Sequence, residues 1–212
     1  VFLLTIPSSA GLIVIGDSII GSLFEGGNFR HYDTLQTAEA LAWFAVGLVG
    51  YAALKILVPA FYALKDSKTP MYISLASIAT NYAIVSTMTR ESSFGHSGLA
   101  LSTAAVAISG SILQFLLLRG RIGGIYGRDL FSSVMKITFA SAVMSFGVWG
   151  AAALAAAALP EGVARYWLTL ALAIPTGIGL YYYTCRYLKI EEMDLAVTAL
   201  ARPLERLRAR IR

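Results

Sequence analysis

The sequence has 212 residues, of which 57% are hydrophobic and 14% are charged, and its formal net charge is +5. A soluble domain carries about 25% charged residues, so this composition excludes an ordinary soluble protein. The single cysteine, Cys185, excludes an internal disulfide and any metal site built from several cysteines.

The apolar residues are gathered in blocks of roughly 20, the length of a helix that crosses the hydrocarbon core of a bilayer. Backbone polar groups in lipid must be satisfied within the segment, and the alternating ten-residue pattern of a membrane barrel is missing, so the blocks predict α-helices. The predicted fold class is an all-α, polytopic membrane helical bundle. Six spans are expected, in chain order: 1–24, 40–64, 71–89, 97–118, 137–159 and 166–185.

The first block begins at Val1, without a methionine. It has no basic segment and no small-residue cleavage pattern, so it is not a secretory signal peptide. This start leads us to expect a piece of a longer protein, cut within or just before a membrane helix.

Positive charges are distributed unevenly among the predicted loops. Of the 17 Lys and Arg residues, only Arg30, Arg90 and Arg165 lie on one face of the bundle, and Lys55 lies within a span; the others lie in the loops 64–70 and 119–136 and in the C-terminal tail. Because Lys and Arg accumulate on the cytoplasmic side, these loops and the tail are predicted to be cytoplasmic. The basic charge is thereby explained by membrane topology, and no nucleic acid is expected as a partner. The tail, 189–212, reads as a basic amphipathic helix on the anionic leaflet.

Lys55 lies about ten residues from the inner end of the second span, which is about 15 Å at the helical rise. An ionisable group near the midplane is costly and is expected to face a cavity or a partner. One interpretation is a cation that lines a polar cavity for an anionic substrate. The other is a structural ion pair with a carboxylate, although Asp17 lies near the outer end of the first span. Pro59, one turn further on, frees a carbonyl and predicts either a hinge beside the cavity or a packing kink.

The stretch "KDSKTP" follows and predicts a tight turn between the second and third spans. Asp66 can cap the next helix or form an Asx-turn, and Pro70 suits the first turn of that helix.

The third and fourth spans contain uncharged polar and small residues. Asn81 and Thr103 could form hydrogen bonds between helices or could be oxygen ligands for a hard cation. Small residues at spacings of three or four predict close helix packing through one face of the fourth span, made by Gly98, Ser102, Ala105 and Ser109.

The sequence predicts no catalytic residue. No serine is accompanied by a histidine and an acid, and no phosphate-binding glycine loop is present. His31 and His96 lie in short loops without a third ligand type, which argues against a metal centre. A transporter or a passive channel fits better than an enzyme.

The stretch "GYAALKILVPAFYALKDSKTP" resembles the signature of the MurJ/MviN lipid II flippases, which belong to the multidrug/oligosaccharidyl-lipid/polysaccharide exporter superfamily. The stretches "SLFEGGNF", "TAEALAWFAVGL" and "FGHSGLALSTA" resemble loops and helices of that family in the same order. The resemblance covers the whole chain and implies spans nine to fourteen of a two-lobe fold. It implies four second-lobe helices over 1–130, two additional C-terminal helices over 131–188 and the cytoplasmic tail over 189–212.

The function implied by this resemblance is movement of lipid II, the undecaprenyl-diphosphate-linked peptidoglycan precursor, across the bacterial inner membrane by alternating access. The expected partners are this lipid, the membrane lipids and the N-terminal lobe that is missing here, and no cofactor is expected. Lys55 would supply positive charge for the diphosphate. Two alternatives stay open: an O-antigen or capsule-type flippase of the same superfamily, and a truncated scaffold protein that does not transport.

The resemblance also bears on a coupling cation, because some family members hold sodium near the second lobe. Asn81 and Thr103 match side-chain ligand positions, and Leu99 would match a backbone carbonyl ligand. The aspartate expected one turn after the asparagine is replaced by Val85.

Overall fold

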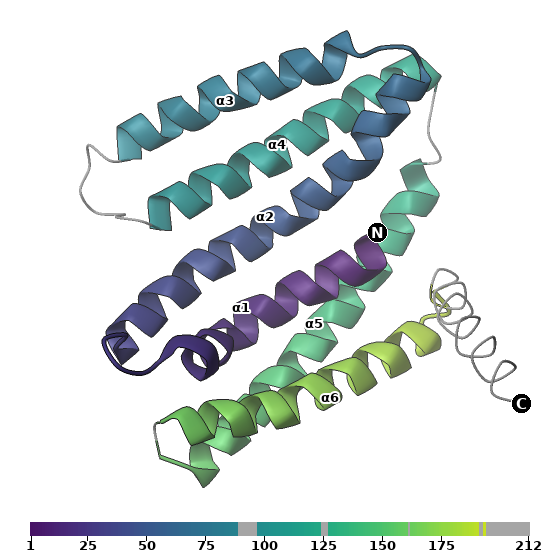
Figure 1. Cartoon of the computed structure of the whole chain (residues 1–212). Coiled ribbons are helices and arrows are strands. Elements are labelled where there is room, and N and C mark those ends of the chain that lie inside the picture. The colour runs from purple at the N-terminus through teal and green to yellow at the C-terminus, as the bar shows by residue number, and fades with distance from the viewer. Residues whose placement is uncertain (89–96, 124–126, 161, 191–192, 194–212) are drawn as a thin grey trace, which may run out of the picture.

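The computed structural model describes residues 1–88, 97–123, 127–160, 162–190 and 193, and every regular element within them is an α-helix. Neighbouring helices run in opposite directions (Figure 1). In chain order they are α1 (Phe2–Phe24), α2 (His31–Ala63), α3 (Lys68–Met88), α4 (Ser97–Ile122), α5 (Gly127–Ala158) and α6 (Val163–Tyr187). The predicted all-α class is confirmed.

Five of the described helices, α1, α2, α4, α5 and α6, are long and apolar enough to cross a membrane. The remaining one, α3, has 21 residues and lies where the third span was expected. Its polar residues, among them Ser74, Ser77, Thr80 and Asn81, make it less apolar than the others. The predicted membrane bundle is confirmed.

Two helices, α2 and α5, begin about ten residues earlier than the apolar blocks predicted. The backbone N–H of Arg30 donates to Asp33 Oδ2 at 2.9 Å, which starts α2 at His31 rather than near residue 40. Likewise α4 continues to Ile122 and α5 begins at Gly127, so the predicted loop 119–136 is wrong for most of its length. Apolar blocks mark only the part of a helix in hydrocarbon, and the helix itself can continue beyond it.

Some predictions concern residues outside the described part of the chain. These include the loop that holds Arg90 and His96, and nearly all of the basic tail 189–212. The predicted division near residue 130 between second-lobe and additional helices stays a prediction.

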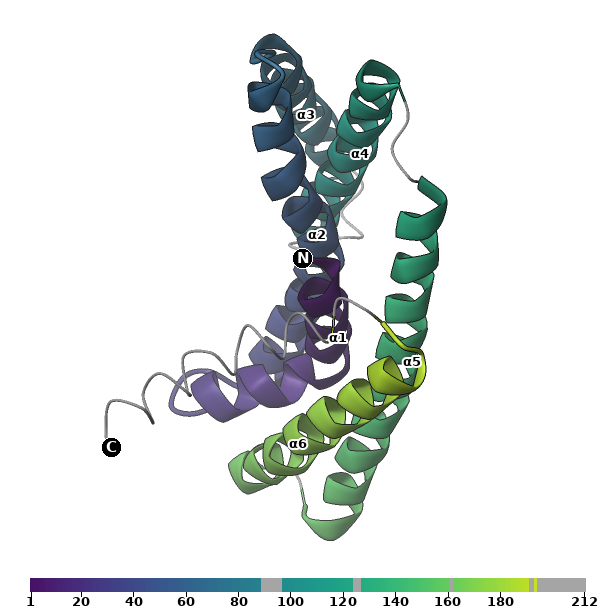
Figure 2. The same ribbon diagram turned by 90° about the vertical axis from the view of Figure 1, so that its right-hand side faces the viewer.

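Helix α1 lies between two groups of helices (Figure 2). It packs against α2 on one side and against α5 and α6 on the other, while α4 packs against both α2 and α3. The larger core joins α1, α5 and α6 and includes Leu3, Ile15, Ala140, Met144, Val148 and Tyr181. A smaller core joins α2 and α4 through Leu57, Phe61 and Leu118.

Two glycines allow α2 and α4 to approach closely. A Cβ atom on Gly47 would lie 2.8 Å from the Cα of Ala104, and one on Gly50 would lie 2.7 Å from the carbonyl carbon of Ala107. Small residues at such positions let membrane helices pack backbone against backbone. The expected contact face of α4 was partly wrong, because Gly98 and Ser102 are buried but Ala105 and Ser109 are exposed. The other buried small residues of this helix are Ala100, Ala104, Ala107, Gly110 and Ser111.

A hydrogen bond between helices replaces the one that Pro7 removes from α1. Pro7 has no N–H to donate to the carbonyl of Leu3, four residues earlier. The Tyr181 hydroxyl of α6 donates to that carbonyl at 2.6 Å, and both residues are buried. On the other side of α1, Ser9 Oγ donates to the carbonyl of Ala45 in α2 at 2.6 Å.

Candidate functional site

Lys55 belongs to an exposed stripe along α2. Exposed residues recur there at spacings of three or four, which places them on one face of the helix. We call this face the Lys55 stripe, and it consists of Phe44, Leu48, Tyr51, Lys55, Pro59 and Tyr62. Other faces of α2 bury Gly47, Gly50, Leu57 and Phe61 against the neighbouring helices. The packing of α2 therefore turns its one intramembrane cation away from the core.

Lys55 forms no ion pair within the described part of the chain. The ion pairs found there join His31 to Glu25 and Arg121 to Asp66. Asp17, the other charge within a span, accepts hydrogen bonds from its neighbour Ser18. The interpretation of Lys55 as half of a structural ion pair therefore has no support among the described carboxylates.

Pro59 lies on the same stripe, and α2 stays helical through it. Because proline has no N–H, the carbonyl four residues earlier loses its helical partner, and that residue is Lys55. The ammonium and the released carbonyl thus belong to one residue. The hinge at Pro59 stays a prediction.

The turn between α2 and α3 is held by local hydrogen bonds and by α4. Lys65 adopts a left-handed conformation with φ of 58°, and the N–H of Asp66 donates to the carbonyl of Phe61 at 3.0 Å, which ends α2. Asp66 Oδ1 accepts the backbone N–H groups of Lys68 and Thr69 at 3.2 and 3.1 Å. Pro70 is buried in the first turn of α3.

Arg121, near the end of α4, joins this turn. Its Nη1 lies 2.6 Å from Asp66 Oδ2, and its Nη2 donates to Thr69 Oγ1 at 3.3 Å. Hydrogen bonds from Thr69, with the nearby Arg121 charge, hold the pKa of Asp66 below its ordinary value. An ionised Asp66 therefore ties the α2–α3 turn to the end of α4.

The residues expected to bind a cation supply only neutral groups. The Thr103 hydroxyl donates to the carbonyl of Leu99 at 2.8 Å, so two of the three expected ligands are bonded to each other. Asn81 is half-buried on α3, and Val85 offers no ligand atom from its side chain. The described residues contain no group of three His, Cys, Asp or Glu side chains that could hold a metal ion. Without a carboxylate, these neutral groups leave the charge of a sodium ion uncompensated in a low-dielectric environment, so cation binding at Asn81, Leu99 and Thr103 stays a prediction.

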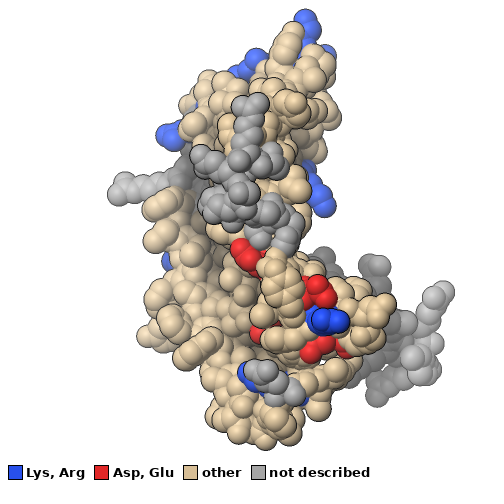
Figure 3. All heavy atoms as spheres, turned by 90° about the vertical axis from the view of Figure 1, so that its left-hand side faces the viewer, with Lys and Arg blue, Asp and Glu red and all other residues tan. Residues whose placement is uncertain are grey.

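A second polar cluster, which sequence reasoning missed, joins α1, α2 and α6 at the opposite end of the bundle. Glu25 Oε2 accepts hydrogen bonds from Thr34 Oγ1 and from the Tyr166 hydroxyl, both at 2.9 Å. His31 Nδ1 lies 3.4 Å from the same carboxylate oxygen and 3.0 Å from the Tyr166 oxygen. Figure 3 views the molecule from the side where α1 connects to α2, and Asp and Glu side chains are gathered there.

Burial opposes ionisation of Glu25, but hydrogen bonds from Tyr166, Thr34 and His31 outweigh it and hold the pKa of this carboxyl below its ordinary value. Glu25, His31 and Thr34 are close in sequence, so a local cluster could have been noticed. Tyr166 is 141 residues from Glu25, and no sequence signal paired them.

The model of one known family, described as lipid II flippase MurJ, matches residues 1–183. The lipid II flippase MurJ of Burkholderia cenocepacia is 39% identical over 129 residues, which cover 59% of this chain and 23% of that protein. A probable lipid II flippase MurJ of Thermotoga maritima is 35% identical over 141 residues, 66% of this chain and 28% of that protein. This chain therefore spans only about a quarter of the length of these relatives.

Among solved structures, a lipid II flippase MurJ in an inward closed conformation matches with a TM-score of 0.67 and 24% identity. The match covers 88% of this chain and 37% of the other. At this identity the likeness shows the fold alone.

Proposed function

Because the chain belongs to the MurJ family of lipid II flippases, we propose that it forms part of a transporter that moves lipid II from the inner to the outer leaflet of the bacterial cytoplasmic membrane. The chain spans only part of its relatives, so this activity is proposed for the whole protein. A further lobe would supply the other wall of the cavity. The proposal requires no catalytic residue and no cofactor.

The observation that carries this proposal is the position of Lys55. An exposed lysine within a membrane-length helix, without a partner among the described carboxylates, needs an anion or a water-filled cavity beside it. The diphosphate of lipid II is such an anion. We therefore assign Lys55 to the wall of the transport cavity, where its ammonium would bind the diphosphate.

The transport mechanism we propose is alternating access, in which groups of helices rock about a central binding site. The close contacts of Gly47 and Gly50 with α4, together with the Asp66–Arg121 ion pair, favour movement of α2 and α4 as one unit. Lys55 would move with that unit and carry the diphosphate from one opening of the cavity to the other.

Three substitutions, made in the full-length protein, test the role of Lys55. Lys55→Met keeps the length of the side chain and removes its charge, so we expect lipid II exposure at the outer leaflet to fall about tenfold. Lys55→Arg should retain most of the activity. Ile56→Ala, at an exposed neighbour outside the stripe, is the matched control and should change little. Unchanged lipid II exposure in Lys55→Met, with normal membrane insertion, would refute this role.

We also propose that the C-terminus and the α2–α3 turn lie on the cytoplasmic side. The uneven distribution of Lys and Arg supports this orientation. Gly120→Cys places a thiol where an added Cβ meets nothing within 4 Å, and the native Cys185 is buried. An impermeant thiol reagent should reach this cysteine only after the cells are opened, whereas Tyr32→Cys should react in intact cells. The reverse pattern would overturn the orientation.

A further inference from the structure

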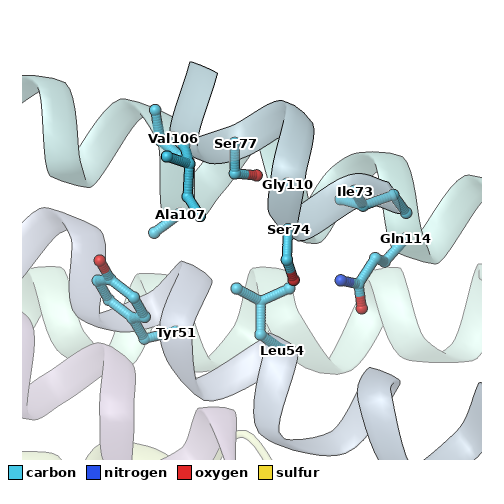
Figure 4. A pocket seen from close by; sticks show the side chains of 10 residues that line it. Tyr51, Leu54, Ile73, Ser74, Ser77, Val106, Ala107, Gly110 and Gln114 are labelled. Atoms are coloured by element: carbon cyan, nitrogen blue, oxygen red, sulfur yellow. The ribbon is translucent and has the colours of Figure 1, made fainter. Parts of the chain in front are cut away.

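A pocket of about 210 Å³ opens between α2, α3 and α4, beside the Lys55 stripe. Figure 4 shows that the three helices contribute side chains to it, with Tyr51 and Leu54 from α2, Ser74 and Ser77 from α3, and Gln114 from α4. A water molecule occupies about 30 Å³ in the liquid, so the pocket is several times larger than one water needs. It is also smaller than most sites for drug-sized ligands, which leaves room for a single small ring.

Gln114 places an amide group in the wall of this pocket, and the oxygen of that amide is unpaired. The residue is only 2% exposed, and its Oε1 atom is buried without a hydrogen-bond partner in the described structure. Its side chain points into the pocket (Figure 4). Buried polar atoms almost always have a partner, so a rotation of this amide that turns Oε1 toward the pocket would be stabilised by a ligand that donates a hydrogen bond.

Two serines of α3 are also available to a ligand. Many serines and threonines in this protein donate to a carbonyl of their own helix, as Ser102 and Ser111 do. Ser74 and Ser77 make no such bond to the described residues, although both line the pocket. Together with Gln114 they offer donors and acceptors on one side of it.

The lining also restricts the charge of the ligand. No Asp, Glu, Lys or Arg lines the pocket, so nothing in it would compensate a phosphate or a metal ion. The other lining groups are the half-exposed ring of Tyr51 and aliphatic side chains such as Leu54. A lining that combines an aromatic ring with neutral hydrogen-bonding groups suits a pyranose ring, which has apolar C–H faces and donating hydroxyl groups.

The position of the pocket relative to Lys55 identifies which sugar it would take. Tyr51 and Lys55 are four residues apart on one face of α2, which is about 6 Å along the helix. We propose that this pocket binds the sugar ring joined directly to the diphosphate that Lys55 holds, an inference that rests on the proposed function. The pocket then binds the neutral sugar, while Lys55 binds the negatively charged diphosphate.

Binding of two lipids to the purified protein tests this inference: lipid II, and undecaprenyl diphosphate without a sugar. In Gly110→Ala the new methyl group lies 3.4 Å from Ser77 Oγ and fills that side of the pocket. We expect its affinity for lipid II to fall about tenfold and its affinity for undecaprenyl diphosphate to stay unchanged. Gly120→Ala, in the same helix but with nothing within 4 Å, is the matched control and should affect neither lipid.

Gln114→Leu gives an independent measurement, because it removes the unpaired amide and keeps the side chain apolar. We expect weaker lipid II binding without a loss of thermal stability, since no hydrogen bond within the protein is broken. If Gly110→Ala weakens both lipids equally or neither, the sugar site is refuted while the flippase proposal stands. If the wild-type protein binds neither lipid, the flippase proposal fails and the sugar site with it.

Discussion

The hydrogen bond from Tyr181 to the carbonyl of Leu3 should depend on the proline in α1. Tyr181→Phe removes the donor and leaves a buried carbonyl that cannot bond within its own helix, because Pro7 stands at the position of the missing N–H. A buried acceptor without a partner costs about 1–3 kcal/mol. Bonds between membrane helices average about 0.6 kcal/mol and reach about 1.7 kcal/mol, so we expect a loss of about 1–2 kcal/mol.

A double-mutant cycle isolates this effect. In a Pro7→Ala background the N–H of residue 7 can donate to Leu3, so Tyr181→Phe should cost much less there than in the wild type. The free energy of unfolding in mixed detergent micelles is the measurement. Tyr183→Phe is the control, because that ring in the same helix is 72% exposed. Equal losses from Tyr181→Phe in both backgrounds would show that the hydroxyl does not replace the bond that Pro7 removes.

Three further predictions concern helix packing, pH and the coupling cation. Gly50→Ala should lower the free energy of unfolding by about 1–2 kcal/mol, because its Cβ would meet the backbone of α4 at 2.7 Å, whereas Gly150→Ala, with open space around it, should not destabilise. The pKa of Glu25 is lower in the folded protein than its ordinary value of 4.5, so the stability that its ionised form contributes is full above about pH 4.5 and is lost as the pH falls through the lowered pKa. Thermal unfolding at pH 7 and pH 4 should therefore differ more in the wild type than in Glu25→Gln, and equal pH dependence would contradict this. We propose that any coupling cation binds weakly near Asn81 and Thr103, so Val85→Asp should make transport more sodium-dependent and Val85→Asn should not; no gain with either would count against a cation at this place.

The positions of the helices could be predicted because each apolar block is about as long as a helix must be to cross the hydrocarbon core. Their ends could not be predicted from hydropathy, since Asp33 starts α2 at His31 in a polar segment that no apolar count includes. The contact face of α4 was ambiguous for another reason. Small residues occur on more than one of its faces, and only the position of Gly47 and Gly50 in α2 decides that Ala104 and Ala107 are covered.

The candidate site was predictable where one residue was chemically out of place. A lysine in an apolar block is visible in the sequence, and so is the turn that begins with Asp66. The sugar pocket was not found, although a glutamine within the fourth span was a visible signal of the same kind. Its meaning depends on Ser74 and Ser77, which reach it only through the packing of α3 against α4. Periodicity shows which residues share a face of one helix, but not which helix covers that face.

The hydrogen bonds between helices indicate where this part of the protein can move. Helix α6 is joined to α1 near both ends, by Tyr181 with Leu3 and by Tyr166 with Glu25, so these two helices cannot slide past each other without breaking a buried bond. Helix α3 packs mainly against α4 and has few contacts with α2, and the hydrogen bond from Arg121 to Thr69 holds it near its first turn. We therefore expect α3 to be the helix that shifts most easily relative to the others. Because Ser74 and Ser77 lie on α3, such a shift would change the width of the sugar pocket beside Lys55. Movement of this helix would thereby change the affinity for the substrate.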